Sequence, residues 1–558
     1  MRALAVLLLL SAAHPAVAQG FDTVISGGTI YDGTGAPGFR GWVALKGDRV
    51  AAVGSGEAPK AARTIDATGK AVAPGFINML SWATESLMVD GRAMSDIKQG
   101  VTLEVLGEGW SMGPYTAEMK TVLARQQQDF RYAIDWTTLG QYLAKLEKAG
   151  ISPNVASFVG ATTVRIHEIG AGDVDPTPAQ LQSMAKLVRE AMNEGAMGVG
   201  SSLIYAPASY AETPELVVLA NASAGCGGSY ISHMRSEGAG IEAAVDELVR
   251  IARESGGPAE MYHMKLSGKD NWGKLPAVLK KVADARAEGL DIRGNMYVYP
   301  AGATGLDASM PTWVQAGGID AWVARLKDPA TRAKVIAEMR GKPVGWENLA
   351  QSAGDPSKVM FIGFRNEKLR PLIGKTLAEV MALRGTSAED TIIDLVIEDG
   401  SRVDTVYFLM SDENVKATAS LPWVTLGSDA EASAPEGLFL KSSTHPRAYG
   451  NVARFLGKYV RDEKVDTLEG AVRRLSGLPA ERLKLADRGF LKPGMAADVV
   501  VFDPATIADR ATFEKPQQYA VGVSHVWVNG VQVLADGTHT GAKPGRFVKG
   551  PGFGKCPA

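Results

Sequence analysis

The spacing of hydrophobic and polar positions changes twice along the chain. Residues 22–75 consist of short apolar stretches broken by Gly and Asp-Gly turns, as in "DTVISGGTIYDGTG" and "GWVALKGDRVAAVG", and this pattern predicts β-strands. The same texture returns near the end, in "ADVVVFDP" and "VSHVWVNGVQVLADG". We therefore expect one small β-sandwich domain built from both chain ends, residues 19–73 and 485–558, with residues 74–484 inserted between its halves.

The inserted residues alternate short apolar runs with longer amphipathic segments. Segments such as "PAQLQSMAKLVREAMNEG" and "GIEAAVDELVRIARESG" carry apolar residues at helical spacing. Eight apolar runs, most of them followed by such a segment, predict an α/β fold of the (β/α)8 TIM-like barrel type. The stretch between the seventh and eighth strands is long and rich in helical patterns. We expect it to form a helical insertion, at about residues 303–400, before the last barrel strand and over the barrel mouth.

The first twenty residues have the pattern of a secretory signal. "MRALAVLLLLSAAHPAVAQG" places Arg2 before an apolar run and an Ala-x-Ala motif before Gln19. We expect a signal peptide at residues 1–18, cleavage after Ala18 and a periplasmic or secreted protein, with an uncleaved anchor as the alternative. No later stretch has the pattern of a membrane span. The two cysteines are Cys226, before an apolar strand, and Cys556, in a Gly-rich tail, and we expect no disulfide between them.

Composition narrows the class of protein further. The chain has 558 residues, 46% of them hydrophobic and 22% charged, and a formal net charge of -2. These values are ordinary for a soluble enzyme, and the length allows one large barrel with a smaller module. The near-neutral charge supplies no strong field for nucleic acid or for an anionic membrane, so we discount both as partners.

Candidate metal ligands stand at the ends of four predicted strands. His233 in "SYISHMRSEG" and His263 in "EMYHMKLSG" end successive strands, and a parallel barrel brings such positions into one mouth. Glu108, between two glycines in "LEVLGEGWSMGP", and Asp429, in "WVTLGSDAEAS", add two carboxylates. Read singly, each could be structural: a buried histidine, a turn residue or a loop cap. Read together, they predict a hydrolytic zinc site with one position open for water.

Ordered motifs over nearly all of the predicted mature chain carry a family resemblance. They include "VISGGTIYDGTG", "IDATGKAVAPGFI", "KLSGKDNWGK", "YPAGATGL", "LGSDA", "HPRAYGNVARFLGKYVRDE" and "GFLKPGMAADVVVFDP". In these the chain resembles the amidohydrolase superfamily, and within it the D-aminoacylase branch of N-acyl-D-amino-acid deacylases. The resemblance implies one tightly held zinc on Glu108, His233 and His263, with Glu108 where the branch has a Cys, and it implies Asp429 as the catalytic residue. It also implies that Lys265, Tyr297 and Arg447 bind the substrate carboxylate.

One segment departs from the family pattern. Where the family has "PGFIDxHxH", this chain has "PGFINMLSW", so that Leu80 and Trp82 replace both histidines and Asn78 replaces the Asp. Leu and Trp do not ligate metals, and an indole would fill the volume that a second metal needs. We therefore expect the second metal site to be lost and one zinc to remain per chain. His167, in "TTVRIHEIG", is a candidate for a substitute ligand or a substrate contact.

These observations lead to one functional hypothesis and two rivals. The first is zinc-dependent hydrolysis of linear amide bonds, foremost the deacylation of small-molecule N-acyl-(D-)amino acids. The second is hydrolysis of another amide, a dipeptide or a lactone on the same scaffold, since a fold does not fix a substrate. The third is a catalytically weakened binding protein that kept the barrel. The presence of Asp429 argues against this third hypothesis, because a binding protein needs no general base.

Overall fold

Strands from the two ends of the chain pair in one nine-stranded sheet. The computed structural model describes residues 20–557, so the expected signal peptide lies outside the described residues. The strand order is β21-β20-β19-β18-β5-β1-β2-β3, with β4 beside β1. Antiparallel pairing of β5 with β18 joins the two chain ends. The strands are β1 (Phe21–Ile30), β2 (Phe39–Lys46), β3 (Arg49–Gly54), β4 (Ala61–Asp66), β5 (Ala71–Pro74), β18 (Val499–Phe502), β19 (Val523–Val528), β20 (Val531–Ala535) and β21 (Thr538–His539).

Parallel strands between these ends form the predicted barrel. They run in two arcs, β6-β7-β8 and β9-β10-β11-β12-β13-β17. Backbone hydrogen bonds join the arcs: Met79 N donates to Leu426 O at 3.0 Å, and Phe158 N donates to Leu106 O at 2.8 Å. The strands are β6 (Phe76–Asn78), β7 (Val101–Leu106), β8 (Asn154–Ser157), which continues into β9 (Val159–Gly160), then β10 (Gly198–Ser202), β11 (Ser229–His233), β12 (Ala259–Met261), β13 (Ile292–Met296) and β17 (Val424–Leu426).

Helices cover the outside of the barrel, and their ends carry the expected signals. In α6, Thr177 and Gln180 form a capping box, Pro178 is the first helical residue, and Gly195 ends the helix in the left-handed region at φ 113°. The helices of the barrel and its flanks are α1 (Ser86–Val89), α2 (Met94–Ile97), α3 (Ala117–Gln126), α4 (Leu139–Ala149), α5 (Ala161–Ile169), α6 (Pro178–Glu194), α7 (Thr213–Ala224), α8 (Ile241–Ser255), α9 (Leu275–Ala287), α15 (Asp412–Ala419), α16 (Arg447–Arg454), α17 (Leu468–Leu475) and α18 (Gly477–Arg482). Among residues 20–557, no helix combines the length and the apolar character needed to cross a bilayer.

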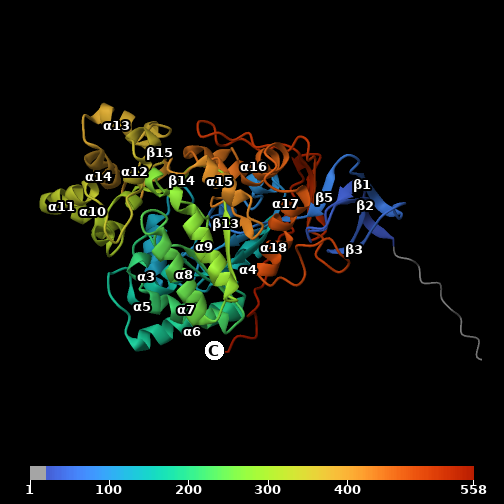
Figure 1. The fold of residues 1–558 in the computed structure, drawn as a ribbon, viewed down its shortest axis with the longest axis horizontal. Helices are drawn as coiled ribbons and strands as arrows, with labels where there is room; N and C mark the ends of the chain where they lie inside the picture. Colours follow the sequence, from blue (N-terminus) through green and yellow to red (C-terminus); the bar gives the residue numbers. More distant parts are fainter. Residues whose placement is uncertain (1–19, 558) are drawn as a thin grey trace, which may run out of the picture.

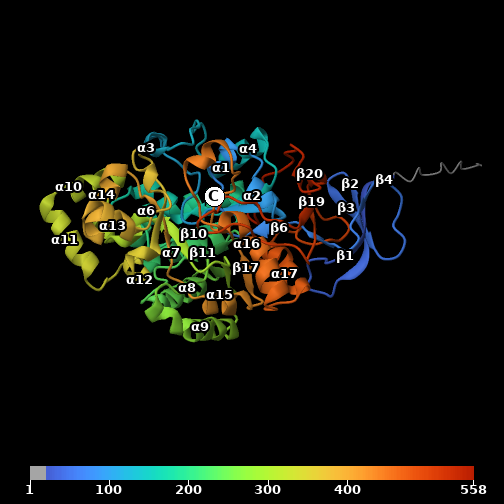
Figure 2. The same cartoon turned by 90° about the horizontal axis from the view of Figure 1, so that it is seen from above.

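The segment between β13 and β17 is an insertion with its own buried core, which includes Leu306, Phe361 and Ile393. It lies at one end of the molecule, with the terminal sheet at the other end and the barrel between them (Figures 1 and 2). Besides helices it contains a three-stranded antiparallel sheet, β14-β16-β15, which the sequence analysis did not predict. Its elements are β14 (Gly302–Gly305), α10 (Ile319–Lys327), α11 (Pro329–Arg340), α12 (Leu349–Ala353), β15 (Val359–Gly363), α13 (Leu377–Arg384), α14 (Ala388–Asp399) and β16 (Asp404–Tyr407).

The expectation of two unpaired cysteines was wrong. Cys226, after α7, and Cys556, in the C-terminal tail, form a disulfide with their Cα atoms 5.1 Å apart. The tail runs back along the barrel, where Val155 N donates to Arg546 O and Gly550 N donates to Gly195 O. These bonds bring Cys556 to Cys226, and sequence distance alone does not reveal that path.

Breaking this disulfide is expected to destabilise the protein without abolishing its fold. Cys556→Ser should lower the free energy of unfolding by ~2–4 kcal/mol, because a cross-link between distant residues restricts the unfolded chain. The measurement is chemical denaturation of the variant and the parent, each with and without reductant. Reductant should destabilise the parent and leave the variant unchanged. Equal stability of parent and variant under oxidising conditions would contradict a structural bridge.

Candidate active site

Glycines on both sides of Glu108 turn its side chain into the barrel mouth. Gly107 and Gly109 have φ of +103° and +71°, in the left-handed region. A Cβ on Gly107 would lie 2.2 Å from Phe158 O, and one on Gly109 would lie 1.9 Å from Ser202 Oγ. No other residue type fits either place without movement of its neighbours. The turn after β7 therefore fixes the direction of the Glu108 side chain. Glu108 is buried, with 4% of its surface exposed.

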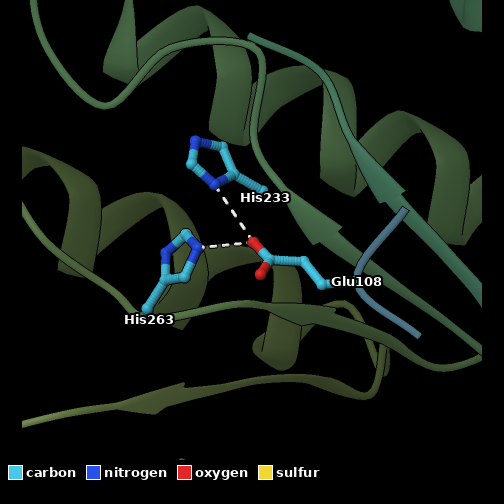
Figure 3. A group of neighbouring side chains, drawn as sticks. All are labelled: Glu108, His233 and His263. Atoms are coloured by element: carbon cyan, nitrogen blue, oxygen red, sulfur yellow. Dashed lines mark hydrogen bonds and ion pairs between the residues drawn. The ribbon is translucent and has the colours of Figure 1, made fainter. Parts of the chain in front are cut away.

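Glu108, His233 and His263 meet at one point. Glu108 Oε1 lies 3.1 Å from His233 Nδ1 and 2.7 Å from His263 Nε2, and the carboxylate points between the two imidazole rings (Figure 3). The three ligand atoms lie within 4.8 Å of one another, and all three residues are buried. His263 has φ 34°, and a conformation this uncommon for a non-glycine residue is characteristic of functional sites.

The electrostatics of this cluster favour a cation. Burial and Lys265 both lower the pKa of His263, but Glu108, Glu237 and Asp429 outweigh them and raise it to about 9. Burial raises the pKa of Glu108, and the two histidines outweigh burial and lower it. Two imidazoles and one carboxylate are also a donor set that suits zinc. The residues present therefore fit a metal ion.

Glu237 contacts the two histidines on the side away from Glu108. The sequence analysis did not identify this residue. Its Oε1 lies 3.0 Å from His263 Nδ1 and 2.6 Å from Lys265 Nζ, and its Oε2 lies 3.8 Å from His233 Nε2. A carboxylate behind a metal-binding histidine fixes the orientation and tautomer of the ring. The available signal was its position in "SHMRSEG", four residues after His233.

Asp429 faces the cluster from the end of β17. Its Oδ2 lies 2.9 Å from Arg447 Nη1, and its Oδ1 accepts a hydrogen bond from Trp82 Nε1 at 3.2 Å. Burial raises the pKa of Asp429, Arg447 opposes that rise, and Glu108 adds to it. Asp429 also has a positive φ, 51°, in the left-handed region that Asp adopts more readily than most residues.

Lys265, Tyr297 and Arg447 gather on one side of the same pocket. The centre of the Arg447 guanidinium lies 4.4 Å from the centroid of the Tyr297 ring, and Lys265 Nζ lies 5.6 Å from it. Arg447 Nη2 donates to Ala303 O at 3.3 Å. Within residues 20–557, Arg447 Nε and Nη1 are buried and lack a hydrogen-bond partner, since the Asp429 contact is an ion pair without hydrogen-bond geometry. Because Nη1 is held in the ion pair with Asp429, Nε is the free donor that suits an anionic ligand.

The pocket has a volume of about 240 Å³, and the insertion contributes to its wall through residues such as Leu349 and Arg402. Trp82 lines it, whereas Leu80 is fully buried in the core beneath. His167, on α5, does not line it. The structure thus brings together the residues predicted for the metal, the carboxylate base and the substrate, and it leaves His167 outside the pocket.

Comparisons with known proteins find relatives over almost the whole chain. A model of the amidohydrolase family matches residues 63–534. N-acyl-D-glutamate deacylase from Alcaligenes xylosoxydans xylosoxydans is 32% identical over 535 residues, 95% of this chain and 96% of that protein. A solved D-aminoacylase, described with a binuclear metal centre, superposes with a TM-score of 0.78 at 33% identity, over 95% of this chain and 100% of that one. N-acyl-D-glutamate deacylase from Bordetella bronchiseptica, complexed with zinc and a phosphonate mimic of the tetrahedral intermediate, gives 0.77 at 30% identity, again over 95% and 100%.

Proposed function

The chain belongs to the amidohydrolase family, and on that premise we propose that it is a zinc-dependent deacylase of N-acyl-D-amino acids. One observation carries the proposal: a buried cluster of metal-ligating side chains, a carboxylate and a cationic group line a single pocket. These are the three parts that hydrolysis of an N-acyl amino acid needs. The relatives named above, which act on N-acyl-D-glutamate or are D-aminoacylases, support the choice of substrate class.

A matched substrate panel tests this proposal. The zinc-loaded protein should hydrolyse N-acetyl-D-amino acids, with much lower activity on their L-enantiomers, and should leave simple lactones and unblocked dipeptides intact. The measurement is product formation by chromatography at equal substrate concentrations: free amino acid from the N-acyl amino acids and dipeptides, and hydroxy acid from the lactones. Hydrolysis of lactones or dipeptides in preference to every N-acyl amino acid would overturn the proposed substrate class.

Each side chain has a separate task in the proposed reaction. Glu108, His233 and His263 would hold the zinc ion, which supplies Lewis-acid chemistry by polarising the scissile carbonyl and making a water more acidic. Asp429 Oδ1 accepts the proton of the attacking water and returns it to the leaving amine nitrogen. Arg447 stays at Oδ2 of the same carboxylate, so that Oδ1 is the oxygen presented for proton transfer.

We propose that one zinc ion per chain is sufficient. Leu80 and Trp82 stand where the family pattern has the two histidines of a second metal site, and neither side chain binds metal. Trp82 N donates to Ala430 O at 2.9 Å, which fixes the tryptophan beside Asp429. The related D-aminoacylase is described as showing one-metal activation and second-metal attenuation, so a single metal is compatible with this chemistry.

The substrate carboxylate is expected to bind at Arg447, with Lys265 and Tyr297 beside it. Arg447→Met should raise KM for N-acyl-D-amino acids by ~30-fold or more, because loss of a buried charge partner costs about 2–5 kcal/mol. KM for the C-terminally amidated analogues, which lack the anion, should change far less. Steady-state kinetics on both substrate series measures the difference.

A second arginine on the same helix provides the control. Arg454 pairs with Asp509 and stacks on Tyr299, and it does not line the pocket. Arg454→Met should leave the ratio of the two KM values unchanged. If Arg447→Met affects acids and amides equally, Arg447 acts by shaping the pocket, and the carboxylate is bound elsewhere.

We further propose that the protein works in an oxidising compartment, the periplasm or the exterior. The support is the Cys226–Cys556 disulfide, since such bridges persist outside the reducing cytosol, together with the signal pattern of the first residues. Mass spectrometry of the protein recovered from its native compartment tests this. A mature chain that begins near Gln19 and carries the intact bridge is the expected result, and a full-length, reduced chain is the contrary one.

A further inference from the structure

Trp82 makes a contact that its size alone does not explain. Its indole Nε1 lies 2.8 Å from Glu108 Oε2 and 3.2 Å from Asp429 Oδ1. One N–H therefore points at both carboxylates. Within residues 20–557, no other donor makes a hydrogen bond to either of these two oxygens. The oxygens on the opposite sides are already engaged: Glu108 Oε1 by the two histidines, and Asp429 Oδ2 by Arg447.

The backbone holds the indole in this place. Trp82 N donates to Ala430 O, and Asp429 N donates to Leu80 O, both at 2.9 Å. Ser81 and Ala430 form a parallel β-bridge. The residues after β6 and after β17 are thus paired on either side of Asp429, so Trp82 and Asp429 keep a constant relative position. An indole fixed by backbone pairing on both sides is suited to orient the carboxylate that it contacts.

The charges explain why a donor is needed there. Two carboxylates that face each other inside a protein repel strongly, since water does not screen them. A cation between them would relieve the repulsion, but Leu80 and Trp82 offer no ligand for one. The indole N–H places a partial positive charge between the same oxygens. A phenylalanine would fill part of the same volume but has no such donor.

We propose that Trp82 is a positioning residue, whose N–H fixes the proton-accepting carboxylate of Asp429 against the metal-binding carboxylate of Glu108. This proposal rests on the proposed function of the site. In this proposal, one neutral side chain reduces the repulsion between the two carboxylates, as a second cation would in a binuclear centre. The proposal also explains how the chain orients its general base without the histidine pair of the family.

Trp82→Phe tests the proposal, because it keeps an aromatic ring and removes the N–H. We expect kcat to fall ~10- to 100-fold, as for loss of a hydrogen bond to a buried charged group, with KM and zinc content close to those of the parent. Trp313→Phe is the matched control: its indole also donates to a carboxylate, Glu338 Oε2 at 2.9 Å, but lies in the insertion away from the pocket. It should leave kcat unchanged.

An NMR readout separates positioning from general damage. The indole N–H resonance of Trp82, assigned by its disappearance in Trp82→Phe, should lie downfield of ordinary indoles and exchange slowly with solvent. If Trp82→Phe does not fold, benzothienylalanine at position 82, which has sulfur in place of N–H, should show the same loss of kcat. An unchanged kcat in either variant, or an indole resonance at an ordinary shift, would overturn the proposal.

The experiment distinguishes this proposal from the function on which it rests. An active parent together with a fully active Trp82→Phe leaves the deacylase function standing and removes the positioning role. A parent that hydrolyses no N-acyl amino acid overturns the proposed function, and the NMR shift and exchange rate of the indole then decide by themselves whether Trp82 bridges the two carboxylates.

Discussion

Asp429→Asn is expected to fold, to retain its metal and to lose turnover by ~10²–10⁴-fold, the usual loss on removal of a general base. The amide has the shape of the carboxylate and still accepts the Trp82 N–H, but it cannot take a proton from water. Asn is also a good choice for the backbone, because φ at this position is 51° and Asn tolerates left-handed conformations. The measurements are kcat, zinc content and thermal unfolding of the same preparation.

Asp536→Asn is the matched control for this variant. Asp536 also has a positive φ, 48°, but its side chain is 90% exposed and lies outside the pocket. It should keep the parent kcat. If Asp429→Asn retains parent activity while holding its zinc, another group accepts the proton and the assigned role is wrong. If it loses both zinc and turnover, Asp429 contributes to holding the metal and not to proton transfer alone.

Removal of the metal is expected to abolish activity. Treatment with a chelator should reduce turnover below detection. Without the metal ion on Glu108, His233 and His263, no Lewis acid polarises the scissile carbonyl. Zinc should restore activity, whereas magnesium should not, because a cluster with two imidazoles favours zinc over a hard cation. Elemental analysis should find about one zinc per chain, and zinc beyond one equivalent should neither bind tightly nor inhibit.

Two controls make the metal result decisive. His525 is a histidine remote from the pocket, next to Asp536, and His525→Gln should keep both zinc and activity. His263→Gln should lose both, because His263 Nε2 faces the shared Glu108 oxygen. Two tightly bound metals per chain would contradict the one-metal proposal. Full activity in a metal-free preparation would contradict metal dependence altogether.

The sequence was sufficient to predict where the candidate site residues would meet, but not how they would bond. Glu108, His233, His263 and Asp429 each follow an apolar run, and parallel strands of a barrel bring such positions into one mouth. The contacts of Trp82 depend on the direction of its side chain and on the pairing of residues 81 and 430, which no local pattern reveals. Trp82 could therefore be predicted as a bulky substitution, but not as a hydrogen-bond donor.

Three other features of the structure were not predicted from the sequence, and each has a physical reason. Glu237 lies four residues beyond the end of β11, in the following loop, so a search confined to strand ends passes over it. The disulfide depends on the path of a Gly-rich tail, which has no hydrophobic periodicity to place it. The sheet β14-β16-β15 consists of strands of four or five residues, and such short segments within a helix-rich stretch give little alternation of polar and apolar positions.

The pairing of the two chain ends has a consequence for the order of folding. The barrel strands follow one another along the chain and can associate as it is made, N-terminal residues first. Strands β1 to β5 of the sheet can also pair early, but the sheet cannot be completed then, because β5 obtains its neighbour β18 only when almost the whole polypeptide is present. Until then the edge of β5 presents unpaired N–H and C=O groups, a template for association with other chains. The last strands to be synthesised therefore complete the sheet that contains the first, so truncated or stalled chains are the species most exposed to aggregation.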